Sequence, residues 1–163
     1  MIKADSVLSE IKKNRVTHVV GVPDNGSRAL YQKLWAEPGI RVIPVAREGE
    51  AFALASGLFL GGKRPIVVIQ NTGFFESGDA FRGTVLNMAI PLVMIIGWRG
   101  FETMSGPGSV DTAATFFEPI LKAWEIPYFV MHTSSESGLI SEAFSKSEGI
   151  SMPVAVIYPG ELD

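Results

Sequence analysis

The stretch "RVIPVAREGEAFALASGLFLGGKRPIVVIQ", residues 41–70, decides the fold of this chain. It begins and ends with short apolar runs, 41–45 and 65–70, in which polar and apolar side chains do not alternate. Such runs are typical of strands buried on both faces of a sheet. The segment between them is rich in Ala, Phe and Leu and suits a helix. The stretch therefore predicts two buried strands joined by a helix, the unit of parallel α/β sheets.

The same alternation continues along the rest of the chain. Four more short apolar runs lie at 17–22, 91–97, 128–131 and 153–158. Helices are predicted at 6–14, 111–124 and 134–147, and the last two begin with Asp111 and Ser134, which suit an N-cap. Strands alternating with helices predict an α/β, three-layer fold: a mostly parallel six-stranded sheet with helices on both faces. Without repeats or linkers, residues 1–163 are expected to form a single domain.

Composition narrows the possible classes of protein. The chain has 163 residues, 47% of them hydrophobic and 19% charged, and a net charge of −3 without a basic block, so nucleic acid is not expected as a partner. No apolar run reaches the roughly 18 residues of a membrane span, and no signal peptide is recognisable, which predicts a cytoplasmic location. The absence of cysteine excludes disulfides and thiolate metal sites. Low charge predicts an apolar surface that binds another protein.

In parallel α/β sheets, functional residues gather in the loops after the carboxyl ends of the strands. Four such loops are expected, at 23–27, 46–50, 70–83 and 98–111. None contains a glycine-rich dinucleotide motif or a phosphate-binding P-loop. The two histidines, His18 and His132, lie on or beside predicted strands, where an isolated histidine is more often a packing residue than a catalyst.

The loop at 46–50 contains an unusual set of charges, Arg47, Glu48 and Glu50, before a helix with hardly any polar side chain. Carboxylates in a first helical turn interact favourably with the helix dipole by about 0.3–1 kcal/mol, which alone could account for them. However, Gly49 between them is a poor helix former, and the helix is too apolar to be solvated. We therefore expect the start of this helix to be enclosed. A carboxyl group in such a place has a raised pKa and can donate a proton near neutrality.

Three segments together resemble the pyrimidine-binding domain of thiamine-diphosphate enzymes: "VVGVP" (19–23), "VIPVAREGEAFALASGLFLGGKRPIVVIQNTG" (42–73) and "IPLVMIIGWRG" (90–100). Within that superfamily the chain most resembles the alpha subunits of sulfopyruvate decarboxylases and the N-terminal halves of phosphonopyruvate decarboxylases. The resemblance extends over residues 1–160 and implies thiamine diphosphate as the cofactor. It further implies that Glu48 hydrogen-bonds N1′ of the cofactor's aminopyrimidine and so promotes loss of the thiazolium C2 proton. Glu50 is expected to be a structural neighbour of Glu48.

The resemblance also implies the remaining site residues. The expected cofactor-binding residues are Glu48, Pro23, Asn71, Thr72 and Gly73, and the expected substrate-binding residues are Asp24, Arg47, Gln70 and Arg99. For Asp24, a purely turn-forming role in Asp-Asn-Gly is an equal alternative. The alternatives for the two arginines are surface ion pairs, Arg47 with Glu50 and Arg99 with Glu102.

One part of the superfamily's site is missing from the sequence. Relatives bind diphosphate and Mg²⁺ through a Gly-Asp-Gly motif and a later Asn, whereas Gly78-Asp79 has neither the third glycine nor that Asn. No metal ligand is therefore expected in this chain, and a beta subunit is expected to hold the Mg²⁺ and the diphosphate in an even-numbered hetero-oligomer. The segment 74–77, Phe-Phe-Glu-Ser, replaces the Gly-Leu-Gly-Asn of many relatives, and its role stays open.

These features predict the alpha subunit of a heteromeric 2-oxoacid decarboxylase. A 3-sulfo- or 3-phosphono-2-oxoacid such as sulfopyruvate is the expected substrate. Three features favour the sulfopyruvate type: the chain is separate from its partner, Arg47 precedes Glu48, and Arg99-Gly100 follows the fourth strand. Two alternatives remain open: a subunit of a thiamine-diphosphate carboligase or synthase, and a non-catalytic partner subunit of the same fold.

Overall fold

The computed structural model describes residues 2–108 and 110–163, whose named strands form one six-stranded sheet with the order β2-β1-β3-β4-β6-β5. Every neighbouring pair of these strands is parallel, which confirms the predicted sheet. The strands are β1 (His18–Gly21), β2 (Arg41–Pro44), β3 (Pro65–Gln70), β4 (Val93–Trp98), β5 (Tyr128–Val130) and β6 (Val154–Pro159).

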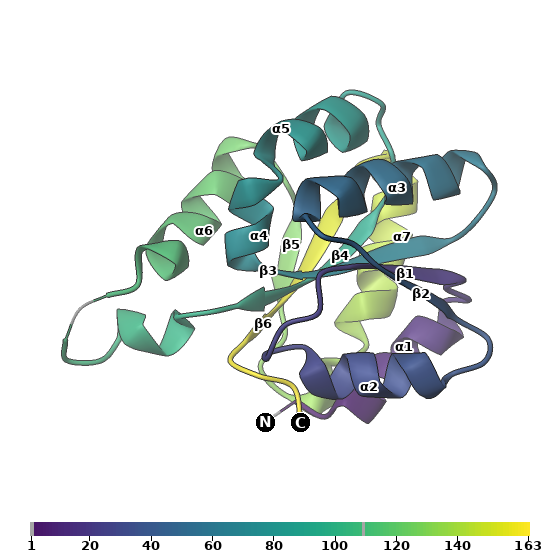
Figure 1. Ribbon diagram of the computed structural model, residues 1–163. Coiled ribbons are helices and arrows are strands. Elements are labelled where there is room, and N and C mark those ends of the chain that lie inside the picture. Colours follow the sequence, from purple (N-terminus) through teal and green to yellow (C-terminus); the bar gives the residue numbers. More distant parts are fainter. Residues whose placement is uncertain (1, 109) are drawn as a thin grey trace.

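Helices cover both faces of the sheet, as predicted (Figure 1). One face carries α1 (Ala4–Lys13), α2 (Arg28–Ala36) and α7 (Leu139–Ile150). The other carries α3 (Glu48–Leu60), α4 (Asn71–Glu76), the short α5 (Gly78–Ala80), the π-helix η1 (Phe81–Leu86) and α6 (Thr112–Ala123). Two 3₁₀ turns, η2 (Phe101–Met104) and η3 (Ser134–Glu136), complete the named elements.

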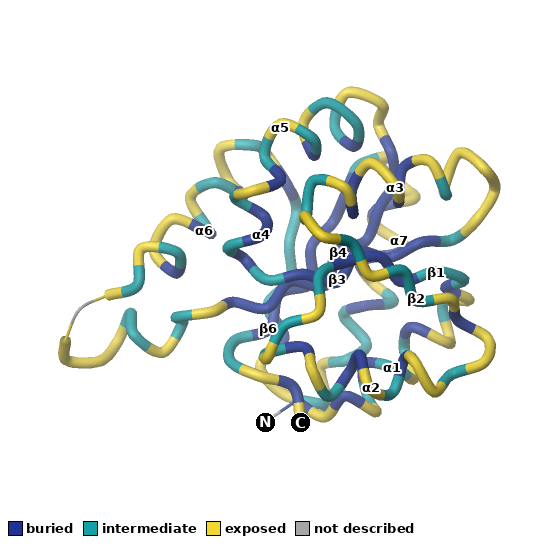
Figure 2. Tube along the Cα trace, in the orientation of Figure 1, coloured by how far each residue is buried: buried dark blue, intermediate teal, exposed yellow. Residues whose placement is uncertain are grey.

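The two central strands explain why the apolar runs lack alternation. Successive side chains of a strand point to opposite faces of the sheet. Ile66 and Val68 of β3 accordingly lie in the core beneath α1, α2 and α7, whereas Val67 and Ile69 lie in the core beneath α3 and α6. Both faces are covered, so both sets of side chains must be apolar. The buried strands run through the middle of the molecule in Figure 2.

Helix α3 is covered on only one side. Ala51, Phe52 and Ala55 are buried against the sheet and its neighbouring helices, as their spacing requires. On the other side, Leu54 is 37% exposed and Leu60 is 62% exposed. The chain itself therefore does not provide the complete enclosure that the apolar sequence of this helix predicts.

Two predictions about local structure were wrong. The segment 70–83 was expected to be a loop, but Asn71 directly begins α4, because Phe74 inserts among Phe52, Phe81 and Phe117 and holds the segment helical. Ser134 was expected to be an N-cap. Thr133 caps instead, through a capping box with Glu136, and α7 begins only at Leu139.

The N-cap predicted at Asp111 is confirmed, since its side chain accepts the Ala113 N–H at 2.9 Å.

Among the helices of residues 2–108 and 110–163, none has the length and apolar character needed to span a bilayer.

Candidate active site

The strand order brings the predicted site residues to one edge of the sheet. After β1 the chain adds β2 on one side of it and then β3 on the other side, so the strand order reverses beside β1. Ligands of open α/β sheets bind at such a switch point. Asp24 follows β1, Glu48 follows β2, Gln70 ends β3 and Arg99 follows β4. Four neighbouring parallel strands thus place their carboxyl ends, and these four side chains, at the same edge.

Three of the predicted substrate residues line one hollow. Asp24, Gln70 and Arg99 surround a space of about 530 Å³ whose wall also includes Gly97 and Glu161. One cation and two carboxylates therefore face this hollow. The sequence predicted the grouping of Asp24, Gln70 and Arg99, but it did not indicate the contribution of Glu161, which follows β6.

Asp24 has the turn-forming role that was one of its two expected roles, and it also lines this hollow. Its Oδ1 accepts hydrogen bonds from the Ser27 N–H at 2.8 Å and the Ser27 hydroxyl at 3.1 Å, which shapes the turn before α2. Its Oδ2 accepts no hydrogen bond from any residue in 2–108 or 110–163. Asp24 therefore forms the turn and still presents a carboxylate oxygen to the hollow that it lines. Pro23, just before it, is exposed.

Glu48 is the first residue of α3 and is half-buried against α4. A Cβ atom added to Gly73 would lie only 2.3 Å from Glu48 Oε1, so the carboxyl group occupies space that any other residue at 73 would fill. No hydrogen bond or ion pair with a residue of the described part of the chain engages this carboxyl group. Glu48 is thus closely packed against α4 yet has a free functional group.

Glu50, in contrast, has the structural role expected for it. Its Oε2 accepts the Ala46 N–H at 3.1 Å and so supports the start of α3. The two glutamates therefore have different surroundings, although only Gly49 separates them in the first turn of α3.

Arg47 does not line the hollow of Asp24, Gln70 and Arg99. The alternative prediction, an ion pair with Glu50, was also wrong, because Arg47 pairs with Glu76. Its guanidinium donates to Glu76 Oε1 from Nε at 2.8 Å and from Nη2 at 2.5 Å. These hydrogen bonds hold the pKa of Glu76 below its usual value. Arg47 lines a separate hollow beside Ala53 and Asp79, because packing of α4 against α3 brings Glu76 next to it.

Asn71 and Thr72 hold neighbouring residues of the site in place by hydrogen bonds. The Asn71 amide donates to the carbonyl groups of Arg99 and Ala113, at 3.2 and 2.9 Å, and its oxygen accepts the N–H groups of Thr72 and Arg99, at 3.1 and 3.2 Å. Asn71 is fully buried, so its side chain braces the loop after β4 and has no surface for direct contact with a cofactor. Thr72 donates its hydroxyl to Gln70 Oε1 at 2.8 Å and so orients that amide.

Arg99 is held only loosely. Its side chain is 61% exposed, and its Nε lies 3.7 Å from Asp111 Oδ2, so the predicted alternative partner, Glu102, was wrong. An exposed ion pair of this kind contributes about 0–1 kcal/mol. The guanidinium therefore remains available to a ligand.

Sequence reasoning missed Glu76 and the second role of Asp111. Asp111 was recognisable as a cap, but its proximity to Arg99 depends on the loop between β4 and α6. Glu76 gave no signal, since its partners lie 27 and 29 residues away. Asp79, part of the incomplete Gly-Asp-Gly match, pairs with Arg82 at 2.6 Å on the surface.

Neither histidine lines the hollow of Asp24, Gln70 and Arg99, but His132 lines an adjoining hollow of about 870 Å³ that shares Gly100, Gly160 and Glu161 with it. His18 begins β1, at the opposite edge of the sheet, and burial lowers its pKa. His132 follows β5 and faces the ring of Phe101, with 6.1 Å between the ring centroids. The position of His18 agrees with its interpretation as a packing or edge residue, whereas His132 lies beside the candidate site.

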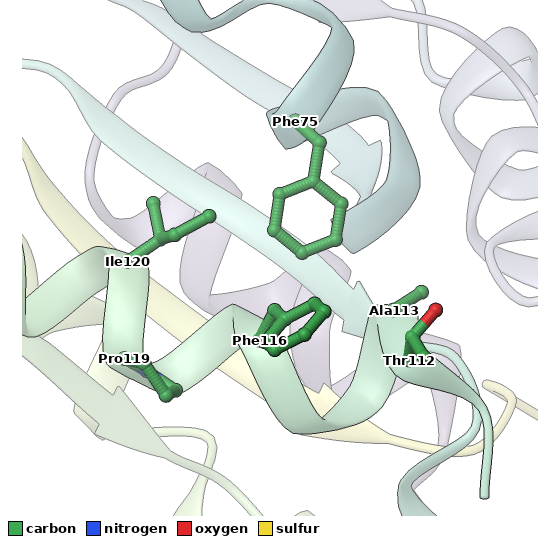
Figure 3. Close-up of a pocket in the computed structure, with 6 residues that line it drawn as sticks. All are labelled: Phe75, Thr112, Ala113, Phe116, Pro119 and Ile120. Atoms are coloured by element: carbon green, nitrogen blue, oxygen red, sulfur yellow. The ribbon is translucent and has the colours of Figure 1, made fainter.

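A small apolar hollow of about 300 Å³ lies near the active edge, between α4 and α6. Figure 3 shows Phe75 of α4 pointing toward Phe116 and Ala113 of α6. Phe116 is 59% exposed, so this surface is apolar and uncovered.

Comparisons with known proteins agree with this geometry. Residues 1–115 match the family model described as the thiamine pyrophosphate enzyme, N-terminal TPP binding domain. The chain is 29% identical over 154 residues to the sulfopyruvate decarboxylase subunit alpha of Methanocaldococcus jannaschii, covering 94% of this chain and 90% of the relative. It is 33% identical over 100 residues to the phosphonopyruvate decarboxylase of Streptomyces viridochromogenes, covering 61% of this chain and 25% of that protein.

A solved structure shows the same fold. The benzoylformate decarboxylase of Polynucleobacter necessarius superposes with a TM-score of 0.74 at 18% identity, and the match covers 98% of this chain and 30% of that one. The family match spans more than half of the chain, and it includes Glu48, Gly73 and the strands that place them. The chain therefore belongs to the family of N-terminal TPP-binding domains of thiamine pyrophosphate enzymes.

Proposed function

We propose that this chain is the alpha subunit, which activates the cofactor, of a heteromeric thiamine-diphosphate-dependent 2-oxoacid decarboxylase. A 3-sulfo- or 3-phosphono-2-oxoacid such as sulfopyruvate is the proposed substrate. The observation that carries this proposal is the Glu48 carboxyl group, which lies against Gly73 at the start of α3 without a partner in the described residues.

The residues present fit an aminopyrimidine ring. Thiamine diphosphate supplies a carbon nucleophile for the 2-oxo group and accepts the electrons released with CO₂. Glu48 holds a proton at N1′ of that ring, and this task needs a carboxyl group that no internal cation or donor has taken. Because Gly73 has no side chain, the Glu48 carboxyl group has the space that it occupies against α4. Asn71 and Thr72 keep Arg99 and Gln70 in place around the substrate.

Arg99 is the proposed ligand of the sulfonate or phosphonate group. A guanidinium donates two parallel hydrogen bonds to such oxyanions. Asp24 and Glu161 lie in the same hollow, so further positive charge for a doubly anionic substrate has to come from the partner subunit. The names of the relatives, sulfopyruvate and phosphonopyruvate decarboxylases, support the same class of substrate.

A beta subunit is the proposed source of the diphosphate and Mg²⁺ site. Relatives over nearly the whole length of the chain are named as alpha subunits. The uncovered apolar side chains of Leu54, Leu60 and Phe116 provide a surface of the kind that binds another protein. We propose an even-numbered hetero-oligomer with the active site between the two kinds of subunit.

Reconstitution with the partner tests this function. The chain, its beta subunit, thiamine diphosphate and Mg²⁺ are incubated with sulfopyruvate, 3-phosphonopyruvate or pyruvate, and CO₂ and the organic products are measured. We expect CO₂ and an aldehyde one carbon shorter, with sulfopyruvate preferred over pyruvate. A product with two joined carbon skeletons would identify a carboligase. Turnover that does not depend on this chain would identify a non-catalytic subunit.

A further inference from the structure

Glu76 has no role in the family resemblance, yet its carboxylate lies between the two residues that flank Glu48. It ends α4. Its Oε1 accepts both hydrogen bonds from Arg47, and its Oε2 accepts the Gly49 N–H at 3.0 Å. A single side chain thus holds the backbone of α3 after Glu48 and the side chain immediately before it.

This contact supplies what the N-cap residue of α3 does not provide. Arg47 occupies the N-cap position with an extended backbone and makes no capping hydrogen bond. The first N–H groups of a helix have no partner within it, and a negative charge near them is favourable. Glu76 satisfies one of these groups and supplies that charge from a different helix.

The same face of α4 also determines the space available to Glu48. Gly73 and Glu76 are three residues apart and therefore lie on one side of α4. Gly73 touches the Glu48 carboxyl group, whereas Glu76 holds the residues on either side of it. The position of Glu48 thus depends on α4 at two points.

Glu76 also takes up the charge nearest to Glu48 in sequence. The charged groups around this start of α3 are Arg47 and Glu50 of its own segment, Glu76 of α4 and Asp79 of α5. Asp79 pairs with Arg82, and Glu50 accepts the Ala46 N–H. Glu76 is therefore the group that engages Arg47, whose charge also interacts with Glu50 and Glu48.

We propose that Glu76 is a positioning residue for Glu48: it fixes the first turn of α3 and keeps the Arg47 guanidinium away from the Glu48 carboxyl group. Its effect on turnover rests on the proposed function, whereas the contact itself does not.

The contact is tested on the full chain alone by NMR, without cofactor. The amide proton of Gly49 should shift as Glu76 ionises, with a midpoint below that of an ordinary glutamate, because the hydrogen bonds from Arg47 lower the pKa of Glu76. Glu76→Gln should abolish this step, and Arg47→Gln should move it to higher pH. Asp79→Asn, which removes a neighbouring exposed ion pair, is the matched control and should leave it unchanged. An unaltered Gly49 titration in Glu76→Gln overturns the proposal.

The effect on Glu48 is tested in the reconstituted enzyme. Glu76→Gln should lower kcat by about 10- to 100-fold, since small misplacements of a reacting group have effects of this size. KM should change less than about twofold, because the substrate hollow is separate. Adding Arg47→Gln should restore the part of kcat that is lost because the guanidinium reaches Glu48, and Asp79→Asn should have no effect. If the double variant is as slow as Glu76→Gln, Arg47 does not need to be kept away from Glu48. If the Gly49 titration behaves as expected but no 2-oxoacid is decarboxylated, the proposed function fails and the contact stands.

Discussion

Two residues of α4, Gly73 and Glu76, determine the surroundings of the Glu48 carboxyl group. Gly73 leaves the space, Glu76 engages Arg47, and Gly49 is held by Glu76 through its N–H. A glutamate in the first turn of an ordinary surface helix has no such surroundings. At the scale of the residue, Glu48 is closely packed but has no hydrogen-bond or ion-pair partner for its carboxyl group among residues 2–108 and 110–163.

Replacing this group should separate folding from chemistry. Glu48→Gln should change the free energy of unfolding by less than about 1 kcal/mol, because it removes only a first-turn charge. Decarboxylation by the reconstituted enzyme should fall by orders of magnitude, since an amide cannot hold the proton at the cofactor. Thermal unfolding and turnover measure the two effects.

Glu50→Gln is the matched control, since it changes the same helical turn at the residue that accepts the Ala46 N–H. It should have the milder effect on turnover. Near-normal turnover in Glu48→Gln would assign the proton transfer to another residue.

The charge of Arg99 should decide which substrates bind well. Arg99→Met should raise KM for sulfopyruvate by at least about tenfold, because hydrogen bonds to charged groups contribute about 1.5–3 kcal/mol. KM for pyruvate, which lacks the second anion, should change far less. Arg82→Met removes another exposed arginine, paired with Asp79, and should affect neither value. Equal losses on both substrates would show that Arg99 supports the structure and does not select the anion.

At the scale of the element, short caps determine where helices begin. Asp111 starts α6 with a side-chain hydrogen bond, and Thr133 and Glu136 form a capping box before α7. The carboxylate of Glu136 accepts the N–H groups of His132 and Thr133, at 2.7 and 2.9 Å, which lowers its pKa. Side-chain hydrogen bonds at these caps thus stabilise the segments that lead from β4 into α6 and from β5 toward α7.

The capping box predicts a pH dependence of stability. A lowered pKa in the folded state means that the Glu136 carboxylate stabilises the fold above the ordinary glutamate pKa of about 4.3. This contribution is lost as the pH falls through the lower, folded value. Glu136→Gln should therefore reduce the free energy of unfolding more at neutral pH than near pH 3. Urea unfolding at both pH values measures this, with Glu142→Gln on the exposed face of α7 as the control. Equal losses at both pH values would contradict it.

At the scale of the whole molecule, the sheet is well covered but the site is open. Both faces of the sheet have a buried apolar core, whereas Leu54 and Leu60 of α3 and Phe116 of α6 remain exposed. Figure 2 shows exposed segments along α3 and α6. The site residues lie at an edge of the sheet that the chain itself does not enclose. The proposed function therefore requires a second subunit to exclude water from these residues.

This predicts that the isolated chain binds thiamine diphosphate weakly or not at all. In the proposed function, Glu48 and its surroundings contact the aminopyrimidine, and the partner subunit binds the diphosphate and Mg²⁺. Titration calorimetry of the chain with cofactor and Mg²⁺ should show little heat, and addition of the beta subunit should produce saturable binding. Glu48→Gln in the complex should weaken this binding. Tight binding by the chain alone would contradict the division of the site between subunits.

The sequence by itself determined the layers of the fold and the position of the central carboxyl group. The runs at 65–70 and 91–97 are apolar at successive positions because both faces of β3 and β4 are covered, so their pattern is readable without a structure. Glu48 was recognisable because a charged start precedes an almost wholly apolar helix, together with the family resemblance.

Only the tertiary structure decided how that carboxyl group is held. The expected loop at 70–83 begins instead with the helix α4, in which the Asn71 side chain supports the loop after β4. Arg47 lies outside the hollow that Asp24, Gln70 and Arg99 line, and it pairs with Glu76. These contacts join residues 27–29 positions apart, which meet because α4 packs against α3. Local patterns report the burial of neighbouring residues along one element, whereas the partner of a side chain depends on how separate elements pack.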